Sequence, residues 1–320
     1  MPIYVEDWQA TYGSPYLVQP EDVGVARVEL VEDGASLVFH EPPAATAAPS
    51  PRLVAFVDGV RRGEASLYQH DPETGALARG IAGSHACGAV LAGGGMPATF
   101  IEERIHRLVI WGSGFSAAIP PVPGGWAWET RSVNDTAVDA PLRELQIRMR
   151  QEEGRLAEHL CARGWLVVVD GPLNFVRSRD LPVVGYVKTH HRMLLTPEHH
   201  KRIPDLKAGQ RSSLFTLGDD RYSCYLRLTA PTPLSGPWAA IVRIEIPQSA
   251  GLDTAIATAN AVAADIPRYA GIPHRDPRAP QNLQPVGALE SHLRHLMGDD
   301  RMACRAVRDA VSQAFAAEVP

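Results

Sequence analysis

The chain has 320 residues, of which 45% are hydrophobic and 21% charged, so it is long enough to bury a substantial core in one large domain or two ordinary ones. Its 31 basic and 36 acidic residues give a net charge of −5, which argues against a protein that coats nucleic acid but leaves room for a local basic channel. The four cysteines form no C-x-x-C pair, which is typical of reduced thiols in a cytosol: Cys87, Cys161, Cys224 and Cys304.

The N-terminal residues "MPIYVEDWQATYG" lack a signal-peptide pattern, and no apolar run reaches the ~20 residues of a membrane span, so a cytoplasmic protein is expected. Two short strands are predicted in "VARVELV" and "ASLVFHE", followed by a Pro/Ala linker, "EPPAATAAPSP". These apolar segments have no obvious role in a core. We therefore expect residues 1–50 to contact a dimer partner or another protein, and residues 51–320 to form the main domain.

Apolar runs separated by turn residues predict strands in the first part of the main domain: "RLVAFVDGV", "RRGEASLYQH", "ALARGIAGSHACGAVLAG" and "RIHRLVIWG". From Pro141 to Arg163, apolar residues recur at spacings of three, four and seven, which predicts a long amphipathic helix closed by Gly164. Further strands are predicted in "WLVVVDGPL", "LPVVGYVKTHH", "SLFTLGDDRYSCYLRLTAP" and "WAAIVRIEIP", and helices in "DTAIATANAVAADIPRYA" and from Pro285 onward. This order predicts an α/β protein with a mixed sheet flanked by helices and antiparallel pairs at one side.

Two phrases place an aspartate directly after an apolar strand, because "LVAFVDGV" contains Asp58 and "WLVVVDGPL" contains Asp170. A single Asp-Gly favours a turn, since Asp accepts local hydrogen bonds and Gly supplies a positive φ. Two such carboxylates on adjacent strands would repel each other unless a cation lay between them. Because Mg²⁺ and Mn²⁺ prefer oxygen ligands, the pair predicts a divalent-metal site for phosphoryl chemistry.

A third acid is predicted from the long helix, in "RMRQEEGRLAEHL". Glu153 follows Met149 by four residues and precedes Leu156 by three, which places it on the apolar, inward side, and Glu152 shares part of that face. An inward carboxylate is costly unless it is paired or metal-bound. The alternative is that both glutamates are solvated at the edge of the stripe.

Basic residues cluster around the second Asp-Gly phrase. Lys188 follows the next strand, in "VVGYVKTHHR", where it could contact a phosphate or orient a nucleophilic water, or could simply be an exposed strand-end lysine. Between Phe175 and Arg192 the sequence contains several basic residues and a single acidic one, Asp180. They predict a track for a phosphate backbone, formed by Arg177, Arg179, Lys188 and Arg192.

Together, the paired Asp-Gly strands, the acidic helix, "GYVKTH" and the late "DPRAPQNLQPVGALESHLRHLMGD" resemble the NurA nuclease family from about Arg52 to Asp299. The resemblance implies an RNase H-like fold, manganese-dependent nuclease activity on DNA, a homodimer, and a HerA-type hexameric ATPase partner in end resection. It also implies metal or catalytic roles for Asp58, Asp170 and Glu153, with Glu152 as the competing register. The family lysine corresponds to Lys188.

The chain departs from the family pattern at two places. The family often has Ser after the first Asp-Gly, where this chain has Val60, so any role of that hydroxyl is lost. The last family ligand is often His or Tyr in a C-terminal helix, where "GALESHL" offers Glu290 and His292. Both flank a predicted buried stripe of Val286, Leu289, Leu293 and Leu296. We predict Glu290, because hard Mn²⁺ or Mg²⁺ prefers a carboxylate to an imidazole.

The sequence therefore predicts a DNA nuclease that depends on Mn²⁺ or Mg²⁺, of the 5′-3′ exonuclease and single-strand endonuclease type, acting with a HerA-type ATPase. Two alternatives stay open: an RNase H-fold nuclease that cleaves RNA, and a weak or inactive nuclease-like subunit that regulates a partner ATPase. Retention of Asp58, Asp170 and an inward glutamate argues against an inactive subunit, because a dead site tends to lose a ligand.

Overall fold

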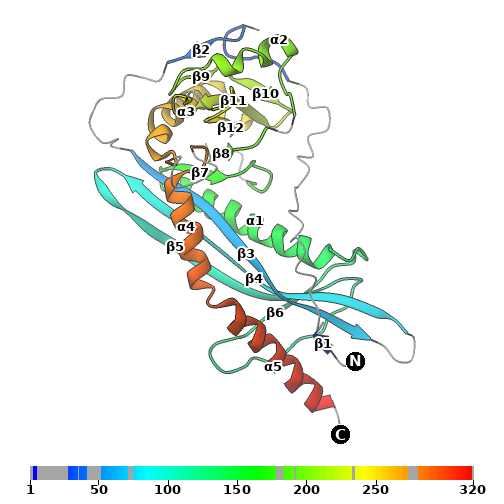
Figure 1. Ribbon diagram of the computed structural model, residues 1–320. Coiled ribbons are helices and arrows are strands. Elements are labelled where there is room, and N and C mark those ends of the chain that lie inside the picture. The colour runs from blue at the N-terminus through cyan, green and yellow to red at the C-terminus, as the bar shows by residue number, and fades with distance from the viewer. Residues whose placement is uncertain are drawn as a thin grey trace.

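The computed structural model describes residues 3–5, 28–34, 36–41, 52–70, 75–177, 183–190, 192–232, 235–272 and 280–318 (Figure 1). Its strands form one mixed sheet in the order β2-β9-β11-β12-β8-β7-β3-β4-β5-β6, with β1 paired to β3 and β10 to β11. The strands are β1 (Ile3–Val5), β2 (Phe39–His40), β3 (Leu53–His70), β4 (Leu77–Gly93), β5 (Met96–Trp111), β6 (Glu129–Ser132), β7 (Leu166–Asp170), β8 (Val183–Val187), β9 (Arg211–Ser212), β10 (Phe215–Leu217), β11 (Arg221–Arg227) and β12 (Ile241–Pro247). The α-helices are α1 (Ala140–Cys161), α2 (Pro197–His200), α3 (Leu252–Asp265), α4 (Gln284–Leu296) and α5 (Asp300–Glu318).

The centre of the sheet is parallel and both flanks are mainly antiparallel. Strand β3 pairs in parallel with β7, and β7 pairs in parallel with β8. On one side β3, β4 and β5 form an antiparallel meander, and on the other β8, β12 and β11 pair antiparallel. The predicted mixed α/β sheet is confirmed, but antiparallel pairs lie on both sides of the parallel centre rather than on one.

Strand β3 runs without a break through Asp58 and Gly59, so the strand end predicted there is wrong. Gly59 lies opposite Cys87 in a continuous ladder with β4. A Cβ atom at position 59 would lie 2.7 Å from Oε1 of Glu153 and 2.9 Å from Cγ of Met149, so glycine serves the close approach of α1 rather than a turn. Strand β7 does end at Asp170, and the following glycine has a φ of +119°.

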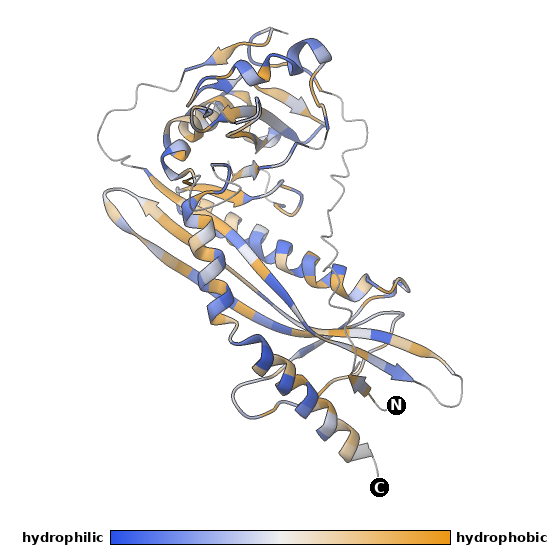
Figure 2. Ribbon diagram, viewed as in Figure 1, coloured by the Kyte–Doolittle hydropathy of each residue, from blue (hydrophilic) through white to orange (hydrophobic). Residues whose placement is uncertain are grey.

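Helices α1 and α4 pack on opposite faces of the sheet at β3. Successive side chains of a strand point to opposite faces. Val57 belongs to the same core cluster as Leu156 of α1, whereas Val60 packs with Leu289 and Leu293 of α4. Figure 2 shows hydrophobic residues gathered in the central strands and mixed hydropathy along the helices, as expected for helices with one buried side. None of the described helices is long and apolar enough to cross a membrane.

The described part of the first fifty residues belongs to the same sheet and core. Strand β2 pairs with β9, and Leu30 forms a bridge with Phe215. Leu37 is buried in a cluster that contains Phe215 and Tyr225, with Phe39 packed against it. The apolar residues of this segment therefore have a core role, contrary to the expectation from the sequence. Residues 42–51 of the predicted linker lie outside the described residues.

Candidate metal centre

Asp58 and Asp170 lie beside each other in the parallel centre of the sheet. Val57 of β3 is opposite Val169 of β7, so the two aspartates occupy the next matching positions along their strands. Asp58 is buried and Asp170 is half-buried, because β7 ends there while β3 continues. The parallel pairing thus brings together the two carboxylates that the sequence singled out.

Glu290 of α4 completes a group of three carboxylates. One oxygen from each of Asp58, Asp170 and Glu290 lies within 4.8 Å of the other two. His292 points elsewhere, since its ring stacks on Phe100 with centroids 4.0 Å apart and its Nε2 lies 3.1 Å from Oε1 of Glu103. Of the two predicted candidates on this helix, the structure brings Glu290, and not His292, to the aspartates.

The buried stripe of α4 differs from the predicted one at its C-terminal end. Val286, Leu289 and Leu293 are buried as predicted, but Leu296 is 37% exposed and Met297 is buried in its place. The helix ends at Leu296, and Met297 caps it. The buried stripe consequently continues onto Met297, which belongs to the same core cluster as Val60 of β3, rather than onto Leu296.

Asp58 is the electrostatically unfavourable member of the three-carboxylate group. Burial, followed by the negative charges of Asp170 and Glu153, raises the pKa of Asp58 well above its usual value. The positive charges of Arg150 and Lys188 act in the opposite direction but do not outweigh these effects. Lys188 pairs with Asp170 at 2.7 Å and Arg294 pairs with Glu290 at 3.0 Å. The all-oxygen donor set of the group suits a hard divalent cation such as Mn²⁺ or Mg²⁺.

Glu153 approaches this group from the α1 face of the sheet, behind Gly59. It is 1% exposed, its Oε2 accepts a hydrogen bond from Arg150 at 2.8 Å, and its Oε1 lies over the backbone of Gly59. Burial raises its pKa, and the charge of Arg150 opposes that shift. Glu153 is not a member of the group within 4.8 Å, although its charge is felt by both Asp58 and Asp170.

Glu152, the competing register, turns away from Gly59 toward the β5 side of α1. Its carboxylate accepts hydrogen bonds from Arg104 at 2.8 Å and from Arg155 at 3.0 Å. Burial raises its pKa, but these hydrogen bonds and the nearby positive charge of Arg104 together outweigh burial and leave the pKa lowered. Both glutamates of the pair are buried, so neither is the solvated edge residue of the alternative interpretation.

Lys188 lies directly against the candidate centre. It follows the last residue of β8, and its Nζ donates to Oδ2 of Asp170 at 2.7 Å. The position is fixed by β7 and β8, since Asp170 is opposite Tyr186 and the amide of Gly171 donates to the Tyr186 carbonyl at 2.9 Å. A cation at the rim of an acidic centre is suitably placed to meet a phosphate oxygen.

The other members of the predicted basic track are exposed or lie outside the described residues. Arg177 is exposed, and its amide donates to Oε1 of Glu158. With Asn174 and Arg221 it lines a cavity of about 360 Å³ between the loop after β7 and β11. Arg192 is exposed, and Arg179 lies outside the described residues.

Arg150 is the contributor that sequence reasoning missed. Besides Glu153, its Nη1 reaches the main-chain oxygen of Asp170 at 2.8 Å, so it ties α1 to the end of β7. The negative charge of Glu153 raises the pKa of Arg150, although burial acts in the opposite direction. The signal in the sequence was a basic residue three positions before an inward glutamate, on the same face of one helix.

A second acidic group, formed by Glu32, Asp33 and His40, has a structural explanation. Arg211 makes a two-pronged contact with Glu32, at 2.7 and 2.6 Å, and Asp33 accepts hydrogen bonds from Ser213 and His40. These contacts hold the N-terminal segment against β9. Protein partners therefore satisfy both carboxylates of this second group.

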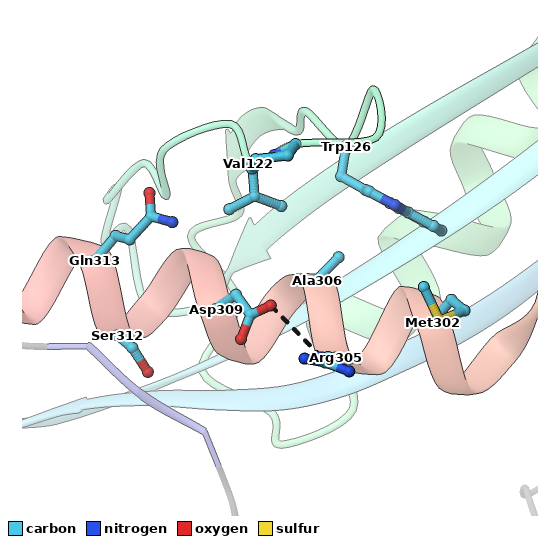
Figure 3. Close-up of a pocket in the computed structure, with 9 residues that line it drawn as sticks. Val122, Trp126, Met302, Arg305, Ala306, Asp309, Ser312 and Gln313 are labelled. Carbon is cyan, nitrogen blue, oxygen red and sulfur yellow. Dashed lines mark ion pairs between the residues drawn. The ribbon is translucent and has the colours of Figure 1, made fainter.

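A separate cavity of about 580 Å³ lies between α5 and the loop that precedes β6 (Figure 3). Trp126 and Met302 line its apolar part, while its one carboxylate, Asp309, lies 3.9 Å from Arg305. This lining holds no set of metal ligands. The acidic group at the centre of the sheet is the better candidate for chemistry.

Comparison of the chain with protein-family models finds no match, and comparison with curated proteins finds none either.

Proposed function

We propose that the protein is a divalent-metal-dependent DNA nuclease of the NurA type, built on an RNase H-like sheet. The observation that carries this proposal is the convergence of carboxylates from β3, β7 and α4 within 4.8 Å of one another. Such a group repels itself unless a cation neutralises it, and burial at Asp58 increases that cost.

The topology supports the fold part of the proposal. The antiparallel meander β3-β4-β5 is followed in the chain by the short edge strand β6, then by α1, β7 and β8. Strands β7 and β8 extend the sheet from β3 with parallel pairing, so that β3, β4, β5, β7 and β8 form a five-stranded unit. The two aspartates lie on the first and fourth strands of this five-stranded unit. Asp170 lies at the carboxyl end of the parallel strand β7, which is where open sheets bind ligands.

Asp58, Asp170 and Glu290 would hold the metal, with Mn²⁺ or Mg²⁺ as the cofactor. A metal of this kind activates a water for attack and offsets the negative charge of a phosphodiester. Lys188, now paired with Asp170, donates to a non-bridging phosphate oxygen of the substrate and offsets the charge that develops there. Glu153 adds a fourth carboxylate from the α1 side, and Arg150 fixes both Glu153 and the end of β7.

The partners remain proposals that rest on the resemblance to the NurA family: DNA as substrate, a homodimer, and a HerA-type hexameric ATPase, all in the cytoplasm. The N-terminal segment no longer adds support for a dimer contact, because its described apolar residues pack into the core. Light scattering at micromolar protein checks the association, and a monomer would count against it.

The nuclease proposal is tested by incubating the purified chain with labelled single- and double-stranded DNA and RNA, in Mn²⁺, in Mg²⁺ and in EDTA. We expect cleavage of DNA that requires the metal and disappears in Asp58→Asn. Asp309→Asn, a change at an exposed carboxylate on α5, serves as the matched control and should retain activity. Cleavage of RNA alone would favour the RNase alternative, and no cleavage of any substrate would favour the inactive subunit.

A further inference from the structure

Helix α4 lies along β3, with its middle beside the acidic group and its C-terminal end bound by side chains of the sheet. At the middle of the helix, a carboxylate oxygen of Glu290 lies within 4.8 Å of one from Asp58 of β3. At its C-terminal end, Nη1 of Arg62 donates to the carbonyl of Gly298 at 2.8 Å and Nη2 donates to that of Met297 at 3.3 Å. Asp58 and Arg62 are on the same face of the same strand, so this one strand contacts both the metal-ligand candidate and the end of its helix.

A second arginine also donates a hydrogen bond to the C-terminal end of α4. Nη2 of Arg107, from β5, donates to the Met297 carbonyl at 3.1 Å. Its guanidinium lies 4.1 Å from the centre of the Trp126 ring, which also lines the cavity beside α5 (Figure 3). The last carbonyls of a helix lack partners within the helix and carry partial negative charge, so two cations here both satisfy and stabilise them.

Both arginines are organised by one buried acid, Glu64. Its Oε1 lies 3.0 Å from Nη2 of Arg62 and 3.5 Å from Nη1 of Arg107, and it accepts a hydrogen bond from Ser84 at 2.6 Å. Glu64 is the extra residue of a β-bulge, because Gly63 and Ala65 pair with consecutive residues of β4 and leave it without a partner there. A bulge re-aims a side chain, and here it turns a carboxylate onto the helix end.

The apolar contact alone does not fix how far α4 sits along β3. Between its two ends, α4 packs on Val60, Ala86 and Val90, which are small aliphatic side chains without directional contacts. Setting one register among several is the best-attested structural use of buried polar and charged groups. Hydrogen bonds to two defined carbonyls supply that direction.

We propose that Arg62 and Arg107, oriented by Glu64, are positioning residues that set the position of α4 along β3 and thereby hold Glu290 against Asp58 and Asp170. This inference rests on the proposed metal site. It assigns no contact with substrate or metal to the three residues, and their effect on the site passes through the helix.

Arg62→Met and Arg107→Met test the proposal, with Arg131→Met on the exposed strand β6 as the matched control. Each folded variant is titrated with Mn²⁺ by electron paramagnetic resonance, and hydrogen exchange along α4 is followed in EDTA. We expect Arg62→Met and Arg107→Met each to raise the Kd for Mn²⁺ about 10-fold, which is the lower end of the range for losing residues that orient a ligand. Arg131→Met should leave the Kd unchanged.

A double variant distinguishes an effect on the position of Glu290 from a general loss of order in the protein. When Arg62→Met is combined with Glu290→Gln, the Kd for Mn²⁺ should equal that of Glu290→Gln alone, because Arg62 acts on the metal site only through Glu290. The inference would be overturned if the two substitutions multiplied each other's effect on the Kd. It would also be overturned if Arg62→Met and Arg107→Met bound Mn²⁺ as tightly as wild type. Glu64→Gln, which keeps the side-chain shape, should act in the same direction if an arginine variant fails to fold.

Hydrogen exchange distinguishes failure of this inference from failure of the proposed function. In EDTA, the α4 amides of Arg62→Met should exchange faster than those of wild type, while the amides of α3 should not change. If wild-type protein binds no Mn²⁺, the metal site and its positioning both fall, whatever the exchange shows. If wild type binds Mn²⁺ but α4 exchange is unaltered in the variant, only the positioning role falls.

Discussion

Replacing Asp58 by Asn should stabilise the metal-free protein while abolishing its response to metal. At an effective dielectric constant of about 20, two charges separated by 4.8 Å repel by about 3.5 kcal/mol, and Asp58 has two such neighbours in Asp170 and Glu290. Lys188 and Arg150 offset part of this repulsion, and Arg294 pairs with Glu290 at 3.0 Å. The raised pKa of Asp58 also favours its neutral form. A net gain of about 1–3 kcal/mol in the free energy of unfolding is therefore expected for Asp58→Asn in EDTA.

The sign of the pH dependence follows from the direction of the pKa shift. The folded-state pKa of Asp58 is raised, so protonation favours the folded state, and that stability is lost as pH rises through the folded-state pKa. Metal-free wild type should therefore lose stability as pH rises above about 4, the ordinary value for Asp. Asp58→Asn should lose less over the same range.

Thermal unfolding in EDTA and in Mn²⁺ measures both effects. At about 2 °C per kcal/mol, Asp58→Asn should raise Tm in EDTA at pH 8 by about 2–6 °C. Wild type should gain about 2.7 kcal/mol at a Mn²⁺ concentration near 100 times the Kd, and the variant should gain little. A variant that is less stable than wild type in EDTA, yet is stabilised equally by Mn²⁺, would refute the reasoning.

Five further substitutions, at the site and in the packing around it, have defined outcomes. Glu290→Gln should weaken Mn²⁺ binding strongly and His292→Ala should leave it nearly unchanged, and the reverse result in a metal titration would move the ligand to the histidine. Lys188→Ala should lower the cleavage rate about 10²-fold without a matching loss of Tm, and a change in Tm alone would make it a structural lysine. Gly59→Ala should lower the free energy of unfolding by about 1–3 kcal/mol, because its Cβ would press on α1. Gly287→Ala, in open space within α4, should instead stabilise by up to about 1 kcal/mol, and equal denaturant midpoints for the two variants would contradict the packing argument.

Much of the fold follows from local patterns, and the exceptions arise from distant contacts. The spacing of leucines predicted α1 to within two residues, because its buried side is continuous. The Asp-Gly at Asp58 predicted a strand end because that dipeptide has a local turn preference. Pairing with β4 and the close approach of Glu153 override the preference, and neither is visible in the neighbouring sequence. The core role of Leu37 likewise depends on residues more than 160 positions away.

The candidate site was partly predictable for the same reason. Asp58 and Asp170 stood out because each follows an apolar strand, although their adjacency depends on the parallel pairing of β3 with β7. Glu290 and His292 were equivalent by spacing, and ligand chemistry favoured Glu290. The packing of α4 on β3 is what brings Glu290 to the aspartates. Arg150 escaped notice because an arginine within a charged helix resembles a solvated residue until its partners are known.

The central claim, that Asp58, Asp170 and Glu290 hold a divalent metal, is tested most directly by crystals of the protein grown or soaked in Mn²⁺ and measured for anomalous scattering. We predict a peak among the three carboxylates, with metal–oxygen distances of about 2.1 Å, which is lost in Asp170→Asn. No peak at saturating Mn²⁺, or a peak only at Glu32, Asp33 and His40, would contradict the claim.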